Sequence, residues 1–122
     1  MLPIRGVFEV VVPVKDLDRA ESFYCDVLGL AVGLRDEARR WLFLRVAADA
    51  GMVVLQEAAE GGAKTHFAFA VDASELDRAT VMLVEAGFEV DGPIDIDWMP
   101  ARAIYFSDPD GHQLELCAVL EK

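Results

Sequence analysis

The sequence predicts an α+β fold built from two tandem β-α-β-β-β modules, and an internal repeat is the main observation behind this prediction. The tetrapeptide LDRA at residues 17–20 returns at residues 76–79. An apolar stretch precedes each copy, at 7–14 and at 67–71, and a glycine follows each copy at a similar distance. Because the flanking segments recur together with the tetrapeptide, we interpret the chain as the product of a duplication.

The length of the chain fits one small domain. With 122 residues, 54% of them hydrophobic, the chain is long enough for a compact unit with a buried core. We therefore expect a single domain over residues 1–122, made of two repeats at about 1–60 and 61–122.

The first half is predicted to form a strand, a helix and three further strands. Residues 7–14 are rich in β-branched and aromatic side chains, as strands prefer. Apolar residues then recur at helical spacing from Leu17 to Leu28, with Asp16 as the predicted N-cap and Gly29 as the stop. Three shorter strands are expected at about 30–35, 41–47 and 52–57.

The second half repeats this order. Residues 65–72 alternate between large and small side chains, as in a strand. A helix follows, with Asp72 or Ser74 as its cap and Gly87 as its stop. Three strands are expected at about 88–91, 102–107 and 112–118, the last two joined by the turn sequence DPDG at 108–111.

Each module should leave one sheet face open, because a single helix covers one face of a four-stranded mixed sheet. In the second half this face is predicted to be small and polar, forming a funnel. By alternation it carries His66, Ala68 and Ala70 from the first strand, Ala103 and Tyr105 from the third, and Gln113, Glu115 and Cys117 from the last.

The charge balance excludes several partner classes. Eleven basic and 22 acidic residues give a net charge of −11, which argues against nucleic acid and anionic membrane surfaces. No apolar run reaches the roughly 18–20 residues of a membrane span. The N-terminus has no apolar signal-peptide core, and the two cysteines, Cys25 and Cys117, form no CxxC motif. We expect a cytoplasmic protein that binds a small molecule.

Three ionisable residues stand in apolar strands: Glu9, His66 and Glu115. A buried carboxylate needs a cation or a hydrogen-bonding partner, or it must protonate. One divalent cation could accommodate all three side chains, since it binds carboxylates and neutral imidazole. The alternatives are a core histidine at position 66 and a salt bridge from Glu115 to Arg40 or Arg102.

Three segments carry a family resemblance. VKDLDRAESFYCDVLGL at 14–30 is close to the pattern V-x-D-L-x-x-(S/A)-x-x-F-Y-x-x-V-L-G-L. THFAFAVD at 65–72 and IYFSDPDGHQLEL at 104–116 open and close the second half. In this order and spacing they resemble the vicinal oxygen chelate superfamily, the glyoxalase / bleomycin-resistance / extradiol-dioxygenase group. The resemblance implies paired β-α-β-β-β modules around a funnel.

The resemblance also implies metal ligands at His66 and Glu115. The family's first-strand ligand, usually His or Gln, lies seven residues before Asp16 and therefore falls on Glu9. A carboxylate there makes the site harder, which favours Mn²⁺, Mg²⁺, Ni²⁺ or Fe²⁺ over Zn²⁺. It also departs from the two His and one carboxylate of extradiol dioxygenases.

The match to the family pattern is less complete at the position of a fourth ligand and at the substrate contacts. Glyoxalase I has a Glu near the end of its first module, where this chain offers Gln56 or Glu57 beside apolar residues at 54–55. The segments around His66 and Tyr105 resemble fosfomycin-resistance thiol transferases, which place a substrate-binding Tyr at the position of Tyr105. Residues 91–102 contain one Arg and no Lys, so the resemblance gives little support for phosphonate binding.

The stretch 92–102 is expected to be a loop over the funnel. Trp98 could contact an apolar substrate or belong to a packed lid. Arg102 could pair with a substrate carboxylate, or with Asp95 or Asp97. Outside this loop, His112 is expected at the surface and Cys117 as a quiet buried thiol.

Two functions follow from the resemblance. The first is a metal-dependent lyase, isomerase or dioxygenase that acts on a small oxygen-chelating metabolite, with Tyr105 as orienting group or proton donor and Glu9 as base. The second is a metal-free binding protein of the bleomycin-resistance type, whose acidic dimers hold cationic drugs. Both imply a homodimer, in which Glu9 of one subunit could join His66 and Glu115 of the other.

Overall fold

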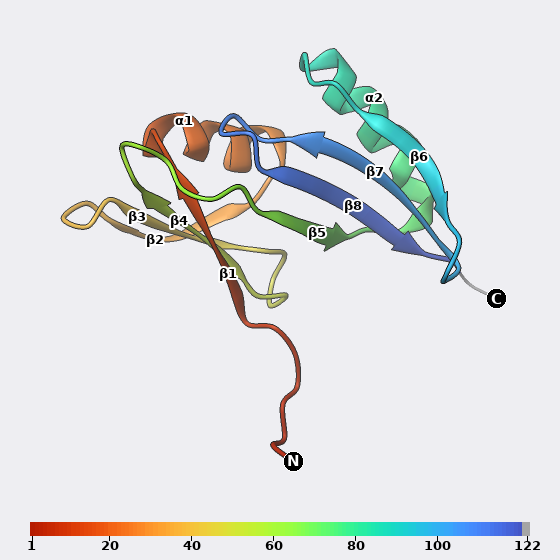
Figure 1. Cartoon of the computed structure of the whole chain (residues 1–122), viewed down its shortest axis with the longest axis horizontal. Helices are drawn as coiled ribbons and strands as arrows, with labels where there is room; N and C mark the ends of the chain where they lie inside the picture. Colours follow the sequence, from red (N-terminus) through yellow and green to blue (C-terminus); the bar gives the residue numbers. More distant parts are fainter. Residues whose placement is uncertain (121–122) are drawn as a thin grey trace. The chain divides into compact units, whose positions relative to one another are not determined.

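The strands and helices of the computed structural model repeat one pattern twice (Figure 1). The structure describes residues 1–120. The first half contains β1 (Glu9–Val14), α1 (Leu17–Glu21), the π-helical segment η1 (Ser22–Val27), β2 (Ala31–Asp36), β3 (Trp41–Arg45) and β4 (Met52–Glu57). The second half contains β5 (His66–Ala70), the 3₁₀ turn η2 (Ala73–Glu75), α2 (Leu76–Glu85), β6 (Asp91–Ile96), β7 (Ala101–Ser107) and β8 (Gln113–Val119).

The two sheets have the same topology. The strand order is β1-β4-β3-β2 in one sheet and β5-β8-β7-β6 in the other. In each, the first strand pairs in parallel with the last, and the remaining pairs are antiparallel. The prediction of an α+β fold with two β-α-β-β-β modules is therefore confirmed. The chain divides into two compact units between Ala63 and Lys64.

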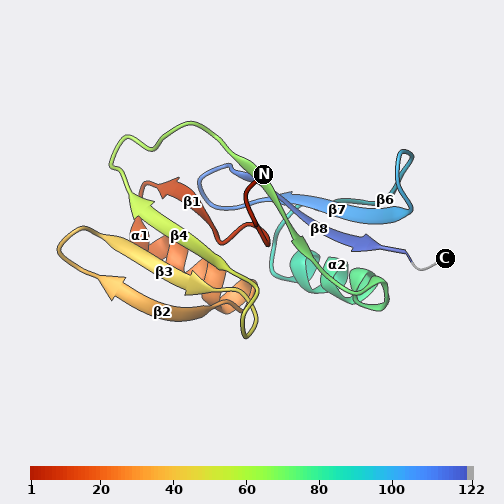
Figure 2. The same cartoon turned by 90° about the horizontal axis from the view of Figure 1, so that it is seen from below.

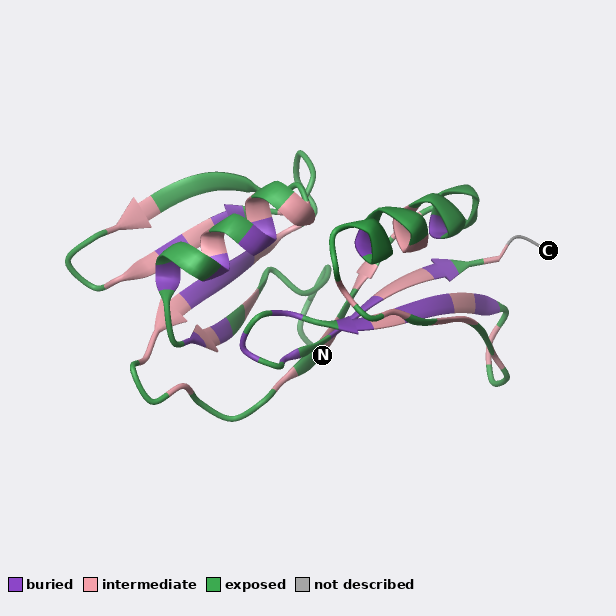
Figure 3. Ribbon diagram, turned by 90° about the horizontal axis from the view of Figure 1, so that it is seen from above, coloured by how far each residue is buried: buried purple, intermediate pink, exposed green. Residues whose placement is uncertain are grey.

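Each unit has its own helix against one face of its own sheet (Figure 2). The side chains between helix and sheet form an apolar core in each unit, and most buried residues lie on the central strands and the inner faces of the helices (Figure 3). The core of the first unit includes Val12, Leu17, Tyr24, Leu42, Leu44 and Leu55, and that of the second includes Leu76, Leu83, Ile104, Phe106 and Leu114. None of the helices in residues 1–120 combines the length and the apolar character of a membrane span.

The helix of the first unit changes its winding. It starts with Asp16 as N-cap, whose Oδ1 accepts a hydrogen bond from the Arg19 amide at 3.1 Å, as predicted. From Ser22 it continues as a π-helix, whose hydrogen bonds span one residue more than those of an α-helix. The adjacent side chains of Phe23 and Tyr24 in this segment are both buried, and their rings meet edge to face at 5.2 Å. Sequence spacing alone did not predict this change.

The prediction for residues 88–102 is wrong in two respects. The strand expected at 88–91 begins only at Asp91, and the expected loop at 92–102 is largely the hairpin of β6 and β7. Gly92 and Pro93 suggested a loop, but β6 is an edge strand, where a proline needs no ladder partner. Gly92 has φ +116°, and the β6–β7 register shifts between Asp91 and Ile94. The glycine therefore allows a bulge that keeps the strand paired.

Candidate functional site

The open face of the second unit brings four strands together around Glu115. Tyr105 on β7 lies opposite Glu115 on β8, and Ala68 on β5 lies on its other side. Asp91 at the start of β6 pairs with Tyr105 in turn. Strand register and alternation thus place the tyrosine and the carboxylate on one face, as predicted, with the small side chain of Ala68 beside Glu115.

His66 completes this group. Its register partner on β8 is Gln113, two residues before Glu115, so the imidazole reaches diagonally to the carboxylate. His66 Nε2 lies 3.4 Å from Glu115 Oε1, and the His66 ring stacks on Tyr105 with centroids 6.4 Å apart. The Glu115 side chain is 11% exposed and that of His66 is 52% exposed. A mostly buried carboxylate therefore lies beside an accessible imidazole.

The surroundings of Glu115 raise the pKa of two neighbouring side chains, Tyr105 and Cys117. The pKa of Tyr105 is raised by burial first, and then by the negative charges near it at Glu115, Cys117 and Asp91. Burial also raises the pKa of the Cys117 thiol, and the charge of Glu115 and a hydrogen bond to it act in the same direction. At neutral pH, Tyr105 is therefore a hydroxyl that can donate a proton or a hydrogen bond.

A tight turn holds the ends of β7 and β8 together. Asp108 Oδ1 accepts hydrogen bonds from the amides of Asp110 and His112, both at 2.9 Å. The expectation that His112 lies at the surface is wrong, because it is 1% exposed. Its Nδ1 accepts a hydrogen bond from the Thr65 amide at 3.0 Å. The burial follows because the ring packs back onto the segment that enters β5.

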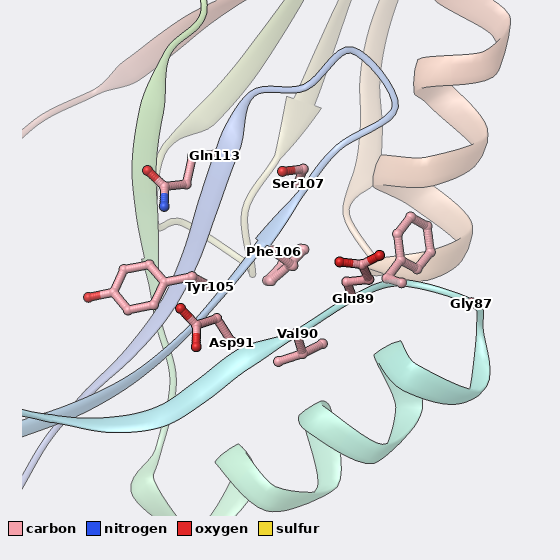
Figure 4. Close-up of a pocket in the computed structure, with 9 residues that line it drawn as sticks. Gly87, Glu89, Val90, Asp91, Tyr105, Phe106, Ser107 and Gln113 are labelled. Carbon is pink, nitrogen blue, oxygen red and sulfur yellow. The ribbon is translucent and has the colours of Figure 1, made fainter.

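A pocket of about 500 Å³ opens beside Tyr105 in the same unit (Figure 4). Tyr105 and Asp91 project side by side from β7 and β6, and Gln113 lies nearby on β8 (Figure 4). The lining consists of Gly87, Phe88, Glu89, Val90, Asp91, Tyr105, Phe106, Ser107 and Gln113. These residues offer hydroxyl, amide, carboxylate and apolar surface but no Lys or Arg, so they suit a neutral or cationic ligand better than an anion.

Two predicted substrate contacts lie elsewhere. Trp98 is 81% exposed in the turn between β6 and β7 and does not line this pocket. Arg102 alternates to the opposite face of β7 from Tyr105, and its Nε lies 3.2 Å from Asp95 Oδ1. Of the partners expected for Arg102, the structure shows Asp95, in an ion pair within the hairpin.

The candidates of the first unit are placed differently. Glu9 is exposed at the start of β1. Gln56 lies on β4 next to Pro13 and Trp41, with its side chain partly exposed.

Glu57 is occupied by structural contacts. It accepts hydrogen bonds from the Leu17 amide at 2.9 Å and from Arg40 Nε at 3.1 Å. The Arg40 guanidinium, with the Leu17 amide, holds the pKa of Glu57 below its usual value. Glu57 thus anchors the start of α1, and Arg40 is its partner rather than that of Glu115.

The distance between His66 Nε2 and Glu115 Oε1 is compatible with both atoms binding one divalent cation. Two ligand atoms at about 2.0–2.2 Å from one ion lie roughly 2.8–3.6 Å apart at the usual angles, and the observed separation is 3.4 Å. Within residues 1–120, however, no three His, Cys, Asp or Glu side chains gather closely enough to hold a metal. The second unit could therefore supply two ligands, and a complete site would need at least one more.

Comparison with known proteins assigns the chain to a family. The model of the Glyoxalase/Bleomycin resistance protein/Dioxygenase superfamily matches residues 6–116, so the chain belongs to this superfamily. It is 30% identical to the metallothiol transferase FosB of Shouchella clausii over 93% of this chain and 80% of that protein. This similarity supports the resemblance to fosfomycin-resistance enzymes that the motifs indicated.

Two solved structures extend the comparison. The integron cassette protein HFX_CASS4, from the mobile metagenome of a Halifax Harbour sewage outfall, is 48% identical with a TM-score of 0.91, over 94% of this chain and 99% of that one. The antibiotic binding protein TnmS3 from Streptomyces sp. CB03234 is 26% identical with a TM-score of 0.82, over 98% of this chain and 100% of that one. An enzyme and a binding protein thus both share this fold.

Sequence reasoning missed parts of the site. It did not single out Glu89 and Asp91 in the pocket, because it predicted residues 88–91 as a regular strand. It also did not predict that His112 supports the segment before His66. The local sequence gave no signal for the latter contact, which joins two residues 47 positions apart.

Proposed function

We propose that this protein is a divalent-metal-dependent enzyme of the superfamily that acts on a small metabolite with adjacent oxygen atoms. The observation that carries the proposal is the His66–Glu115 pair: a buried carboxylate 3.4 Å from an accessible imidazole, on the sheet face that the helix leaves uncovered. We further propose that the two units act as a single domain and that Glu9 supplies the missing ligand, from the same chain or from a second copy in a homodimer.

The residues of the second unit have distinct roles in this proposal. His66 and Glu115 would hold the metal, with Mn²⁺, Mg²⁺, Ni²⁺ or Fe²⁺ favoured over Zn²⁺ by the share of carboxylate ligands. A bound divalent ion supplies Lewis-acid stabilisation of a developing oxyanion or enolate. Tyr105 orients the substrate and, as a neutral phenol, donates a hydrogen bond or a proton to it. Glu9, proposed above as the third ligand, is also the candidate base, a role that it would take when it is not bound to the ion.

The pocket favours a class of substrate. Glu89 and Asp91 bring two carboxylates to its lining, and no Lys or Arg lies there. We therefore propose a neutral or cationic oxygenated substrate, and not a phosphonate, in spite of the similarity to FosB. Trp98 and Arg102 are not assigned to the substrate in this arrangement, because one lies in the hairpin turn and the other pairs with Asp95.

A metal-free binding protein is the second candidate. The similarity to an antibiotic binding protein favours it. In this alternative the acidic pocket would hold a cationic drug or metabolite, and His66 and Glu115 would form only a structural pair.

Metal content separates the two candidates. The protein is purified without an affinity tag, and the wild type is compared with Glu115→Gln and with Glu85→Gln, which removes the same charge from the exposed end of α2. The enzyme proposal predicts about one divalent ion per chain in the wild type and in Glu85→Gln, and loss of the ion in Glu115→Gln. If the wild type holds no metal and no divalent ion raises its Tm, the enzyme proposal is wrong and the binding protein takes its place.

A further inference from the structure

The two histidines of this chain have different environments. His66 projects from the open face of the second unit, whereas His112 is almost completely buried in the turn between β7 and β8. Nothing in the proposed reaction uses His112 directly. A buried imidazole in a small domain needs hydrogen-bonding partners, and its contacts indicate what it does.

The contacts of His112 lead to the residue before His66. Its Nδ1 accepts a hydrogen bond from the Thr65 amide at 3.0 Å, and the amide of the next residue, Gln113, donates to the Thr65 carbonyl at 2.9 Å. The backbone amide and the backbone carbonyl of Thr65 are therefore each held by one of two consecutive residues, His112 and Gln113. This clamp lies immediately before β5, where His66 pairs with Gln113.

The turn between β7 and β8 also holds the backbone of His112 in place. Asp108 Oδ1 accepts a hydrogen bond from the His112 amide at 2.9 Å, and the His112 carbonyl accepts one from the Asp108 amide at 3.0 Å. Lys64, just before Thr65, donates to the Asp110 carbonyl. The segment before β5 and the turn after β7 are thus joined at several points.

We propose that His112 is a positioning residue that sets the register and direction of His66, so that its imidazole meets Glu115 and Tyr105. The proposal rests on the proposed function only in so far as the His66–Glu115 pair binds a metal. Loss of the Nδ1 acceptor would leave the Thr65 amide without this bond and release the start of the edge strand β5. His66 would then sample orientations that do not face Glu115.

Three substitutions separate this role from simple packing. His112→Asn keeps an acceptor oxygen at the δ position, His112→Gln moves it to the ε position, and His112→Leu removes it. Leu83→Ala, a cavity variant in the buried face of α2, serves as a control that lowers stability without touching Thr65. The affinity for Mn²⁺ is measured at a temperature where each variant is folded.

Positioning predicts a split between stability and affinity. His112→Leu and His112→Gln should bind Mn²⁺ at least tenfold more weakly, His112→Asn should stay close to the wild type, and Leu83→Ala should lose Tm but keep its affinity. Equal affinity in a folded His112→Leu would overturn the proposal. If His112→Leu does not fold, His112→Gln decides in the same way.

An NMR measurement decides the question without a metal. The wild type should show slow exchange of the Thr65 amide and a scalar coupling between its nitrogen and His112 Nδ1. Nuclear Overhauser contacts between the His66 and Tyr105 rings should be present in the wild type and in His112→Asn, and lost in His112→Gln. If those contacts persist in His112→Gln, the proposal is wrong. If the wild type binds no Mn²⁺ but the contacts follow this pattern, the metal function fails and the positioning role stands.

Discussion

Tyr105 and Glu115 face each other across the antiparallel strands β7 and β8, on the sheet face that α2 leaves open. Their side chains therefore share one environment, in which the carboxylate is mostly buried and the phenol is partly buried. The negative charge of Glu115 and the burial of the ring both favour the neutral phenol. The proximity of Glu115 therefore supports the proposed role of Tyr105 as a proton or hydrogen-bond donor, and its effect on the pKa of Tyr105 can be measured.

The first prediction concerns the ionisation of Tyr105. Its pKa should lie above the ordinary value for tyrosine, and Glu115→Gln should lower it toward that value, because the substitution removes a negative charge but retains the burial. The titration can be followed by NMR of ¹³C-labelled tyrosine, and Tyr24 provides the second tyrosine as an internal reference. An unchanged Tyr105 pKa in Glu115→Gln would mean that the two groups do not interact.

The second prediction concerns stability at alkaline pH. Tyr105 and Cys117 both have raised pKa values, so the folded state holds their protons more tightly than the unfolded state. Their contribution to stability is present at neutral pH and is lost as the pH rises through the folded pKa values. Denaturant unfolding should therefore show a decline above about pH 9 that is smaller in Cys117→Ala. A decline of the same size in that variant would contradict the prediction for the thiol.

The third prediction concerns the other unit. Glu57 has a lowered pKa because of Arg40 and the Leu17 amide, so its contribution to stability is lost as the pH falls through its folded pKa. Glu57→Gln should lower the Tm at neutral pH, and the difference from the wild type should shrink in acid, where Glu57 is protonated in both states. Glu60→Gln, at an exposed loop position, is the control and should have little effect at any pH. A pH-independent loss in Glu57→Gln would indicate that the charge is unimportant.

The fourth prediction concerns the bulge of β6. A Cβ at residue 92 would lie 2.7 Å from the Ala103 carbonyl oxygen, at a φ of +116°. Gly92→Ala should therefore destabilise the protein by about 1–3 kcal/mol. Gly6→Ala, where an added Cβ meets nothing within 4 Å, is the matched control. Equal Tm values for the two variants would show that the bulge can shift without cost.

Much of the fold was predictable because it depends on short-range patterns. The LDRA repeat and its flanks gave two modules, and alternation along β5, β7 and β8 gave the shared face of His66, Tyr105 and Glu115. The DPDG turn was predictable for the same reason. Local sequence decides the direction of a side chain in a regular strand, and these strands are regular.

The features that were not predictable depend on tertiary context. Pro93 looked like a loop residue, but it is tolerated because β6 is an edge strand. His112 looked like a surface residue, but the ring is buried because it accepts the Thr65 amide, 47 residues away in sequence. For Arg102 the sequence left a substrate carboxylate, Asp95 and Asp97 open as partners, and the ion pair with Asp95 depends on the hairpin register. The partner of His112 and the choice among the alternatives for Arg102 cannot be identified from local spacing.

Calorimetric titration with Mn²⁺ tests most directly whether His66 and Glu115 bind the same divalent ion, as proposed. The wild type, His66→Ala, Glu115→Gln and the double variant are compared, with near-ultraviolet circular dichroism to confirm that each is folded. We expect each single substitution to weaken Mn²⁺ binding by tenfold or more. In the double variant, the loss of binding free energy should be smaller than the sum of the two single losses, because both side chains would bind the same ion. Undiminished Mn²⁺ affinity in both single variants, or no binding by the wild type, would contradict the account.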